Sequence, residues 1–384
     1  MFIQTLSGWD SILTSLVTFF LIFYVLHTVD SFSKRLPVGK SRRIKDLNMP
    51  NQGTSHTAAT LAAAVLSVTL LHQLFCKRKK NTVPPKYQIP PELLHVEYSE
   101  ELQLAVKLAM QAGENMIPHL ESKGTDQGCE TNLGINIKQN KADFATIIDL
   151  QNEELVINGL KERFPDHEII GEEMTGTGAL PPLTDKPTFI IDPIDGTTNF
   201  ASGSPLTCVS IGLCVKGRPV MGVVFSPVTR ELFLAHKGCG AFRNAKKISS
   251  TSGKCDKSLS NAVVCFEFGY TVSEDGVNNM VDAARRILLH GCRTTRTYGA
   301  GVLDLCMVAY GAIDVCYTGI AGEGWKPWDY CAATCIAEEA GCTIQSLKDH
   351  IDGQPFDIYS KSMICGVNRT IVDECRNVVL GLKN

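Results

Sequence analysis

IIDPIDGTTNF, at residues 190–200, is the strongest signal in the chain. An apolar run that ends in Asp192 and Asp195 indicates a strand that delivers two carboxylates to a proline-stiffened turn. Such carboxylates suit Mg²⁺, which binds a few of them together with water and substrate phosphate. If Gly196 and Thr197 open a helix, their N–H groups form an anion site beside the metal. Taken alone, the segment is more typical of an Asx turn with a helix cap.

Two further groups of acidic residues favour the phosphoryl chemistry. Glu172 and Glu173 directly follow an apolar run at 168–171, and Asp329 lies in the first turn of a helix predicted near 328–340. Each has an ordinary explanation, because surface Glu is common and an acid near a helix start is favoured by the helix dipole. Three clusters in one chain are less easily explained by chance.

The surrounding sequence predicts mixed α/β layers rather than a purely parallel sheet, because strands, hairpins and helices interleave. Apolar spacing predicts helices near 99–120, 148–164, 274–290, 301–310 and 328–340, with Ser99 as the cap of the first. Short apolar runs bounded by breakers predict strands at 168–171, 188–191, 206–215, 220–225, 231–235 and 312–317.

The combined motifs resemble those of the inositol monophosphatase family over roughly residues 95–384. The matching segments are GEE at 171–173, DPIDGTTNF at 192–200, WD at 328–329, AA at 332–333 and EAG at 339–341. The resemblance implies an α-β-α-β-α sandwich of the inositol monophosphatase/fructose-1,6-bisphosphatase type. It also implies a lithium-sensitive phosphomonoesterase that uses two or three Mg²⁺ ions and is usually a homodimer.

The resemblance further implies roles for individual residues. The implied metal ligands are Glu172, Asp192 and the Ile194 carbonyl for one ion, and Asp192, Asp195 and Asp329 for another. The implied phosphate donors are the N–H groups of Gly196 and Thr197. The implied catalytic residues are Asp149, Thr197 and Glu172, which orient the attacking water, while Lys138 aligns with a family lysine near the metal site.

The substrate pocket is where this sequence departs from the family. Gly299, Ala300 and Gly301 resemble a backbone segment that contacts substrate, but Thr318 stands where a ring-contacting glutamate is expected. The loop before Asp329 is a few residues longer than usual, and its Glu323 either replaces that glutamate or faces solvent. The resemblance favours inositol monophosphate as the substrate, whereas the altered loop before Asp329 motivates a sugar phosphate or histidinol phosphate as the alternative. A non-catalytic membrane scaffold is a third hypothesis.

The N-terminal 90 residues differ in composition from the rest of the chain. They carry 11 Lys and Arg against 3 acids, whereas the remainder carries 26 against 37. An acidic catalytic part argues against nucleic-acid binding, which depends on Lys and Arg. The apolar run at about 11–29 favours a transmembrane helix, with a cleaved or uncleaved targeting segment as the alternative, and a basic linker follows to residue 50. A second apolar segment at about 57–76, a basic cluster and a proline-rich linker fill 51–91, so the catalytic domain is expected at 92–384.

Cysteine usage bears on the compartment. The chain has 15 Cys, and most lie in apolar runs where they are expected as small buried residues rather than as disulfides. Many free thiols favour a reducing compartment. We therefore expect a membrane-anchored protein whose catalytic domain faces the cytoplasm.

Overall fold

The computed structural model describes residues 87–124, 133–138, 144–251, 257–269, 271–322 and 324–382. The two apolar segments at 11–29 and 57–76 and the linker up to residue 86 lie outside these residues, as does Glu323. Within the described ranges, no helix combines the length and the apolar character that crossing a membrane requires.

The largest element is a seven-stranded sheet in which only β3 and β4 run parallel. Its strands, in spatial order, are β3 (Glu168–Gly171), β4 (Thr188–Asp195), β5 (Cys208–Val215), β6 (Arg218–Ser226), β7 (Glu231–His236), β8 (Gly240–Arg243) and β9 (Lys246–Ile248). A separate pair joins β1 (Asn136–Ile137) to β2 (Phe144–Ala145).

The second sheet has five strands and mixed direction. Its spatial order is β11 (Thr294–Arg296), β10 (Val263–Phe266), β12 (Val315–Thr318), β14 (Met363–Gly366) and β13 (Thr343–Gln345). β10 runs parallel to both of its neighbours, whereas β14 is antiparallel to β12 and β13. The prediction of mixed sheets is confirmed.

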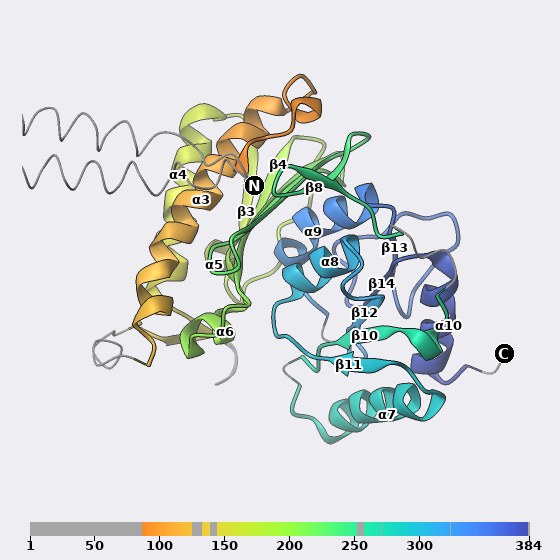
Figure 1. The fold of residues 1–384 in the computed structure, drawn as a ribbon. Helices are drawn as coiled ribbons and strands as arrows, with labels where there is room; N and C mark the ends of the chain where they lie inside the picture. Colours follow the sequence, from red (N-terminus) through yellow and green to blue (C-terminus); the bar gives the residue numbers. More distant parts are fainter. Residues whose placement is uncertain are drawn as a thin grey trace, which may run out of the picture. The chain divides into compact units, whose positions relative to one another are not determined.

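Helices alternate with these two sheets as layers (Figure 1). The helices are α3 (Ser99–Ser122), α4 (Ile147–Arg163), α5 (Glu172–Thr175), α6 (Thr197–Ser202), α7 (Glu274–His290), α8 (Gly301–Ala309), α9 (Pro327–Glu339) and α10 (Arg369–Leu380), with 3₁₀ turns η2 (Pro91–Leu93) and η4 (Leu259–Asn261). Helices α3 and α4 cover one face of the large sheet, α8 and α9 lie between the sheets, and α7 and α10 pack on the outer side of the small sheet. The described residues thus form the expected α-β-α-β-α sandwich.

Helix α9 is buried on nearly all sides because it lies between two sheets. Two glycines of the large sheet allow its close approach. A Cβ added at Gly222 would lie 2.3 Å from the carbonyl oxygen of Ala332, and one at Gly212 would lie 2.4 Å from Sγ of Cys331. This contact fixes the start of α9, and therefore Asp329, over the carboxyl-terminal end of β4.

Three local expectations need correction. Ser99 begins α3 but does not cap it, since Tyr98 occupies the cap position in a left-handed conformation and no side-chain cap bond is present. The strand expected at 188–191 continues to Asp195, so the predicted turn is part of β4. Strands β8 to β11 have no expected counterpart, because segments of three or four residues owe their conformation to their partners rather than to a local apolar pattern.

Candidate active site

Asp192 and Asp195 lie on the same side of β4 because the strand is irregular there. Residues three apart in a regular strand point to opposite faces. The pairing of β4 with β5 shifts register between Asp192 and Asp195, as a bulge does. With Asp329 from the first turn of α9, they place one carboxylate oxygen each within 4.8 Å of one another. The structure therefore brings together three of the predicted metal ligands from two distant parts of the chain.

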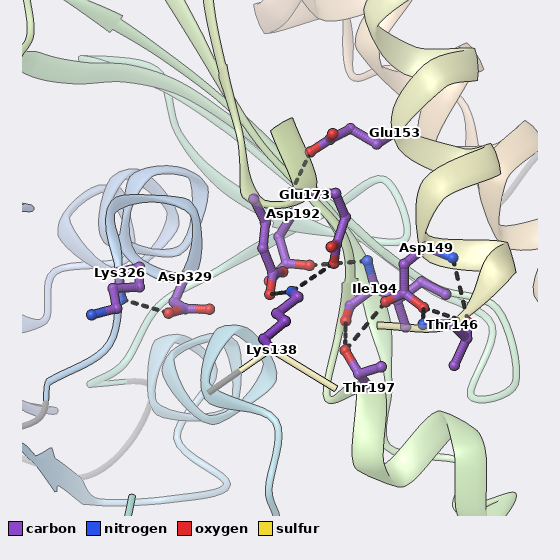
Figure 2. Close-up of polar contacts among 11 residues, drawn as sticks. Lys138, Thr146, Asp149, Glu153, Glu173, Asp192, Ile194, Thr197, Lys326 and Asp329 are labelled. Atoms are coloured by element: carbon purple, nitrogen blue, oxygen red, sulfur yellow. Dashed lines mark hydrogen bonds and ion pairs between the residues drawn. The ribbon is translucent and has the colours of Figure 1, made fainter. Parts of the chain in front are cut away.

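Each of these three carboxylates is held by a backbone N–H through one oxygen. Oδ1 of Asp192 accepts from Ile194 at 2.9 Å, and Oδ2 of Asp195 accepts from Val302 at 3.2 Å. Oδ2 of Asp329 accepts the N–H of Lys326 at 2.6 Å, which ties the first turn of α9 to the residue before the helix. One oxygen of each group is thus fixed by the fold, and Figure 2 shows these bonds for Asp192 and Asp329.

The charges of these groups favour a bound cation. Burial, followed by the charges of neighbouring carboxylates, raises the pKa values of Asp192 and Asp195 well above the ordinary range and that of Asp329 to about 7. Three carboxylates this close, two of them buried, repel one another unless a cation or protons lie between them. A donor set of carboxylate oxygens fits a hard divalent ion such as Mg²⁺.

Glu172 and Glu173, at the start of α5, are the other two acidic residues of the candidate site. The Lys138 ammonium pairs with both carboxylates at 2.7 Å (Figure 2). Burial alone would lower the pKa of Lys138, but these two carboxylates raise it, so the lysine stays charged. Glu172 also raises the pKa of Asp192, which places its charge next to the three-carboxylate cluster.

Glu153 is a buried residue of this region that the sequence analysis missed. Its Oε1 accepts the N–H of Glu173 at 2.8 Å and so holds the α5 turn against α4. Burial raises the pKa values of both Glu153 and Glu173 to about 7. Glu153 sits in the middle of α4 without a motif around it, so local sequence gave no signal for this role.

Thr197 and Asp149 meet where α6 and α4 begin. Oγ1 of Thr197 lies 3.2 Å from Oδ1 of Asp149 and 3.1 Å from the carbonyl oxygen of Ile194 (Figure 2). Asp149 is fully buried, and its other oxygen accepts the N–H of Thr146 at 2.8 Å. Burial raises its pKa to about 6. Gly196 caps α6 with φ of 76°, a conformation that suits glycine.

The segment predicted to contact substrate lies directly beside this cap. A Cβ added at Gly196 would lie 3.1 Å from the carbonyl oxygen of Gly299 and 3.2 Å from the Cβ of Ala300. Asn199 of α6 donates to the carbonyl oxygens of Leu206 at 2.8 Å and Tyr298 at 2.7 Å. The predicted phosphate and substrate segments are thus tied together by one amide side chain.

The remaining pocket predictions have different outcomes. A Cβ added at Gly301 would lie 2.7 Å from the Trp325 ring, so this glycine faces the indole. Thr318 ends β12 and is 1% exposed, and its hydroxyl has no hydrogen-bond partner among the described residues. The glutamate expected at that position is therefore replaced by a buried neutral side chain. Glu323 lies outside the described residues.

Comparisons with known proteins agree with this arrangement. The sequence model of the Inositol monophosphatase family matches residues 97–378. Inositol monophosphatase 1 of Bos taurus is 33% identical over 276 residues, which cover 72% of this chain and 92% of that protein. The suhB protein of Bartonella henselae has a TM-score of 0.62 at 25% identity and covers 73% of this chain and 98% of its own. The Thermotoga maritima IMPase has a TM-score of 0.60 at 27% identity, with 73% and 97% covered.

Proposed function

This chain belongs to the inositol monophosphatase family, and from that premise we propose that it hydrolyses an inositol monophosphate to inositol and phosphate. Its membership makes it a phosphatase, and metal dependence is expected of the family. The observation that carries the proposal is the convergence of Asp192, Asp195 and Asp329, each with one oxygen fixed by a backbone N–H.

The proposed metal ligands divide into two sets that share Asp192. Glu172, Asp192 and the carbonyl oxygen of Ile194 would hold one ion, and Asp192, Asp195 and Asp329 would hold another. When bound, Mg²⁺ lowers the pKa of water at the site and offsets negative charge on the phosphate and the leaving oxygen.

The protein groups supply orientation. In the proposed mechanism the Thr197 hydroxyl donates to Asp149, which turns its oxygen lone pairs toward the attacking water. Glu172 lies close enough to share in that orientation. The backbone N–H groups of Gly196 and Thr197 bind phosphate oxygens, where the charge of the transition state is spread.

Two observations bear on which phosphate ester this site binds. The relatives that carry the name inositol monophosphatase favour an inositol phosphate. The second candidate, a sugar phosphate or histidinol phosphate, is kept because the buried Thr318 puts no carboxylate where the family resemblance places a glutamate that contacts the inositol ring. A scaffold without activity has little support, since each acidic residue expected at the metal site is present.

The purified full-length chain tests the proposal. Phosphate release is measured with Mg²⁺ on inositol 1-phosphate, several hexose phosphates and histidinol phosphate, with Asp192→Asn as the inactive control. A preference for inositol 1-phosphate that lithium suppresses supports the proposal. A preference for another ester would mean that the same site hydrolyses a sugar phosphate or histidinol phosphate instead. Equal background release by both proteins on every ester contradicts phosphatase activity.

We also propose that the chain is anchored in a membrane through residues 11–29, with the catalytic domain in the cytoplasm, and that it is a homodimer. The apolar run and the free cysteines support the first idea, and the family resemblance supports the second. Carbonate extraction of membranes followed by protease protection of the catalytic domain tests anchoring and topology. Light scattering of the detergent-solubilised protein tests the dimer.

A further inference from the structure

Glu267 holds two successive backbone amides of the predicted substrate segment. It follows β10 directly, and its Oε1 accepts the N–H of Tyr298 at 2.7 Å and the N–H of Gly299 at 2.9 Å. Asn199 donates to the Tyr298 carbonyl oxygen at 2.7 Å. The segment is therefore held through its donors by Glu267 and through an acceptor by Asn199.

The position of this segment affects both halves of the candidate site. Gly299 and Ala300 adjoin Gly196, the cap of the predicted phosphate-binding helix. The chain then enters α8, where the N–H of Val302 donates to Oδ2 of the candidate metal ligand Asp195. A shift of this segment would therefore first displace Gly299 and Ala300, which are predicted to contact the substrate. It would then reach the candidate metal ligand Asp195 through α8.

Asp304, in the first turn of α8, is an ionisable neighbour of Glu267. Asp304 is fully buried, and neither of its carboxylate oxygens has a hydrogen-bond partner among the described residues. Its neighbours are Glu267 and the Cys265 thiol, with the charge of Asp195 further away. Burial above all, and then these neighbours, raises the pKa of Asp304 well above its ordinary range. A fully buried carboxyl group whose two oxygens receive no hydrogen bond from the described residues is expected to hold a proton.

We propose that Glu267 is a positioning residue that fixes the substrate segment at Tyr298 and Gly299, and that Asp304 acts as a neutral acid that donates to Glu267. This inference rests on the proposed phosphatase function. It assigns to Glu267 no contact with the substrate. Its effect passes through the two amides, so it is expected in KM more than in kcat.

The test compares three variants of the full-length protein. Glu267→Ala leaves both amides unpaired, and we expect KM to rise about tenfold or more, as the loss of buried bonds to a charged acceptor predicts. Asp304→Asn keeps a neutral donor at the same place, and we expect its KM to stay within about twofold of the parent. Glu339→Ala is the matched control, because Glu339 accepts the N–H groups of Gly238 and Gly240 at a turn outside the candidate site.

Hydrogen exchange provides a readout that does not depend on activity. In Glu267→Ala, exchange in the peptide that carries Tyr298 and Gly299 should accelerate about tenfold or more, while Asp304→Asn and Glu339→Ala leave it unchanged there. If the parent hydrolyses no phosphate ester, the proposed function is wrong. The hydrogen-exchange experiment still tests whether Glu267 holds the amides of Tyr298 and Gly299. Unchanged exchange in Glu267→Ala overturns the proposal.

Metal analysis tests a different role for Asp304, that of a metal ligand. The oxygens and sulfurs of Cys265, Asp304 and Cys316 lie within 4.8 Å of one another, a grouping that could hold a soft metal ion. If Asp304 is a neutral acid, the parent protein should hold no zinc at this position, and Asp304→Asn should leave the zinc content unchanged. Stoichiometric zinc in the parent that is lost, together with activity, in Asp304→Asn and Cys316→Ser overturns the neutral-acid role. Cys214→Ser, from a buried thiol pair with a sulfur separation of 3.7 Å, is the control for thiol loss.

Discussion

The Thr197 hydroxyl lies 3.2 Å from Oδ1 of Asp149, although the two residues are 48 positions apart in the chain. Both stand in the first turn of a helix, α6 and α4 respectively. The second oxygen of Asp149 is held by the Thr146 N–H, so its carboxylate cannot turn away from Thr197. This fixed geometry makes the protonation state of Asp149 a direct influence on the threonine hydroxyl.

Activity should fall as the pH drops through about 6. Burial raises the folded-state pKa of Asp149 from 3.8 to about 6, so the carboxylate that accepts from Thr197 is present above that pH and is lost below it. The measurement is kcat at saturating Mg²⁺ from about pH 5 to about pH 8. Asp149→Asn should have low activity, and its kcat should not fall further as the pH drops through about 6; this fall is the acid limb of the pH profile. An identical acid limb in that variant would assign the titration to another group.

Asp192→Asn should abolish turnover and yet stabilise the metal-free protein. Loss of a shared ligand should lower kcat by at least about a thousandfold, roughly 4 kcal/mol of transition-state stabilisation. Removal of one buried charge removes its desolvation cost and its repulsion with Glu172, Asp195 and Asp329, so the melting temperature in chelator should rise by a few degrees, about 2–4 °C per kcal/mol. The rise in melting temperature that Mg²⁺ causes in the parent should disappear.

The exposed Asp185 supplies the control for that experiment. Asp185→Asn removes the same charge from the surface and should change neither turnover nor the response to Mg²⁺. A full Mg²⁺ response in Asp192→Asn would show that the three carboxylates are not the metal site.

Gly301→Ala should damage the pocket through Trp325. The added Cβ would lie 2.7 Å from the indole, which is closer than van der Waals contact permits. Overpacking of this kind costs about 1–3 kcal/mol, and displacement of the ring should raise KM. Melting temperature and KM are measured for Gly301→Ala and for the double variant with Trp325→Leu. The second substitution should restore the melting temperature. Equal losses in both variants would mean that the indole is not the obstacle.

Glu153→Gln should stabilise the metal-free protein only above acidic pH. The folded-state pKa of Glu153 is raised from 4.5 to about 7, so the folded state resists ionisation and stability declines as the pH rises between these values. Glutamine removes this penalty and keeps an oxygen for the Glu173 N–H. The difference in melting temperature should be near zero at about pH 4 and positive at about pH 8. If the melting temperatures of the parent and of Glu153→Gln change with pH in parallel, Glu153 does not have the raised pKa assigned to it.

Local patterns in the sequence were sufficient for the first half of β4 at 188–191, for the acid in the first turn of α9 and for the mixed α/β class, whereas the α-β-α-β-α order came from the family resemblance. Each depends on a run of apolar residues with breakers beside it. The register shift in β4 could not be predicted, because it depends on how β5 pairs with that strand. Glu267 was missed for a similar reason, since its partners Tyr298 and Gly299 lie 31 and 32 positions away.

The distribution of the metal ligands also has a consequence for biosynthesis. Strand β4 supplies Asp192 and Asp195, but Asp329 arrives with α9, which packs against β5 and β6 through Gly212 and Gly222. A nascent chain on the ribosome holds two of the three carboxylates long before it can present the third. In the proposed assignment, the ion that needs Asp329 would therefore add its binding free energy only after α9 has been made, whereas the ion assigned to Glu172, Asp192 and Ile194 needs no residue beyond β4.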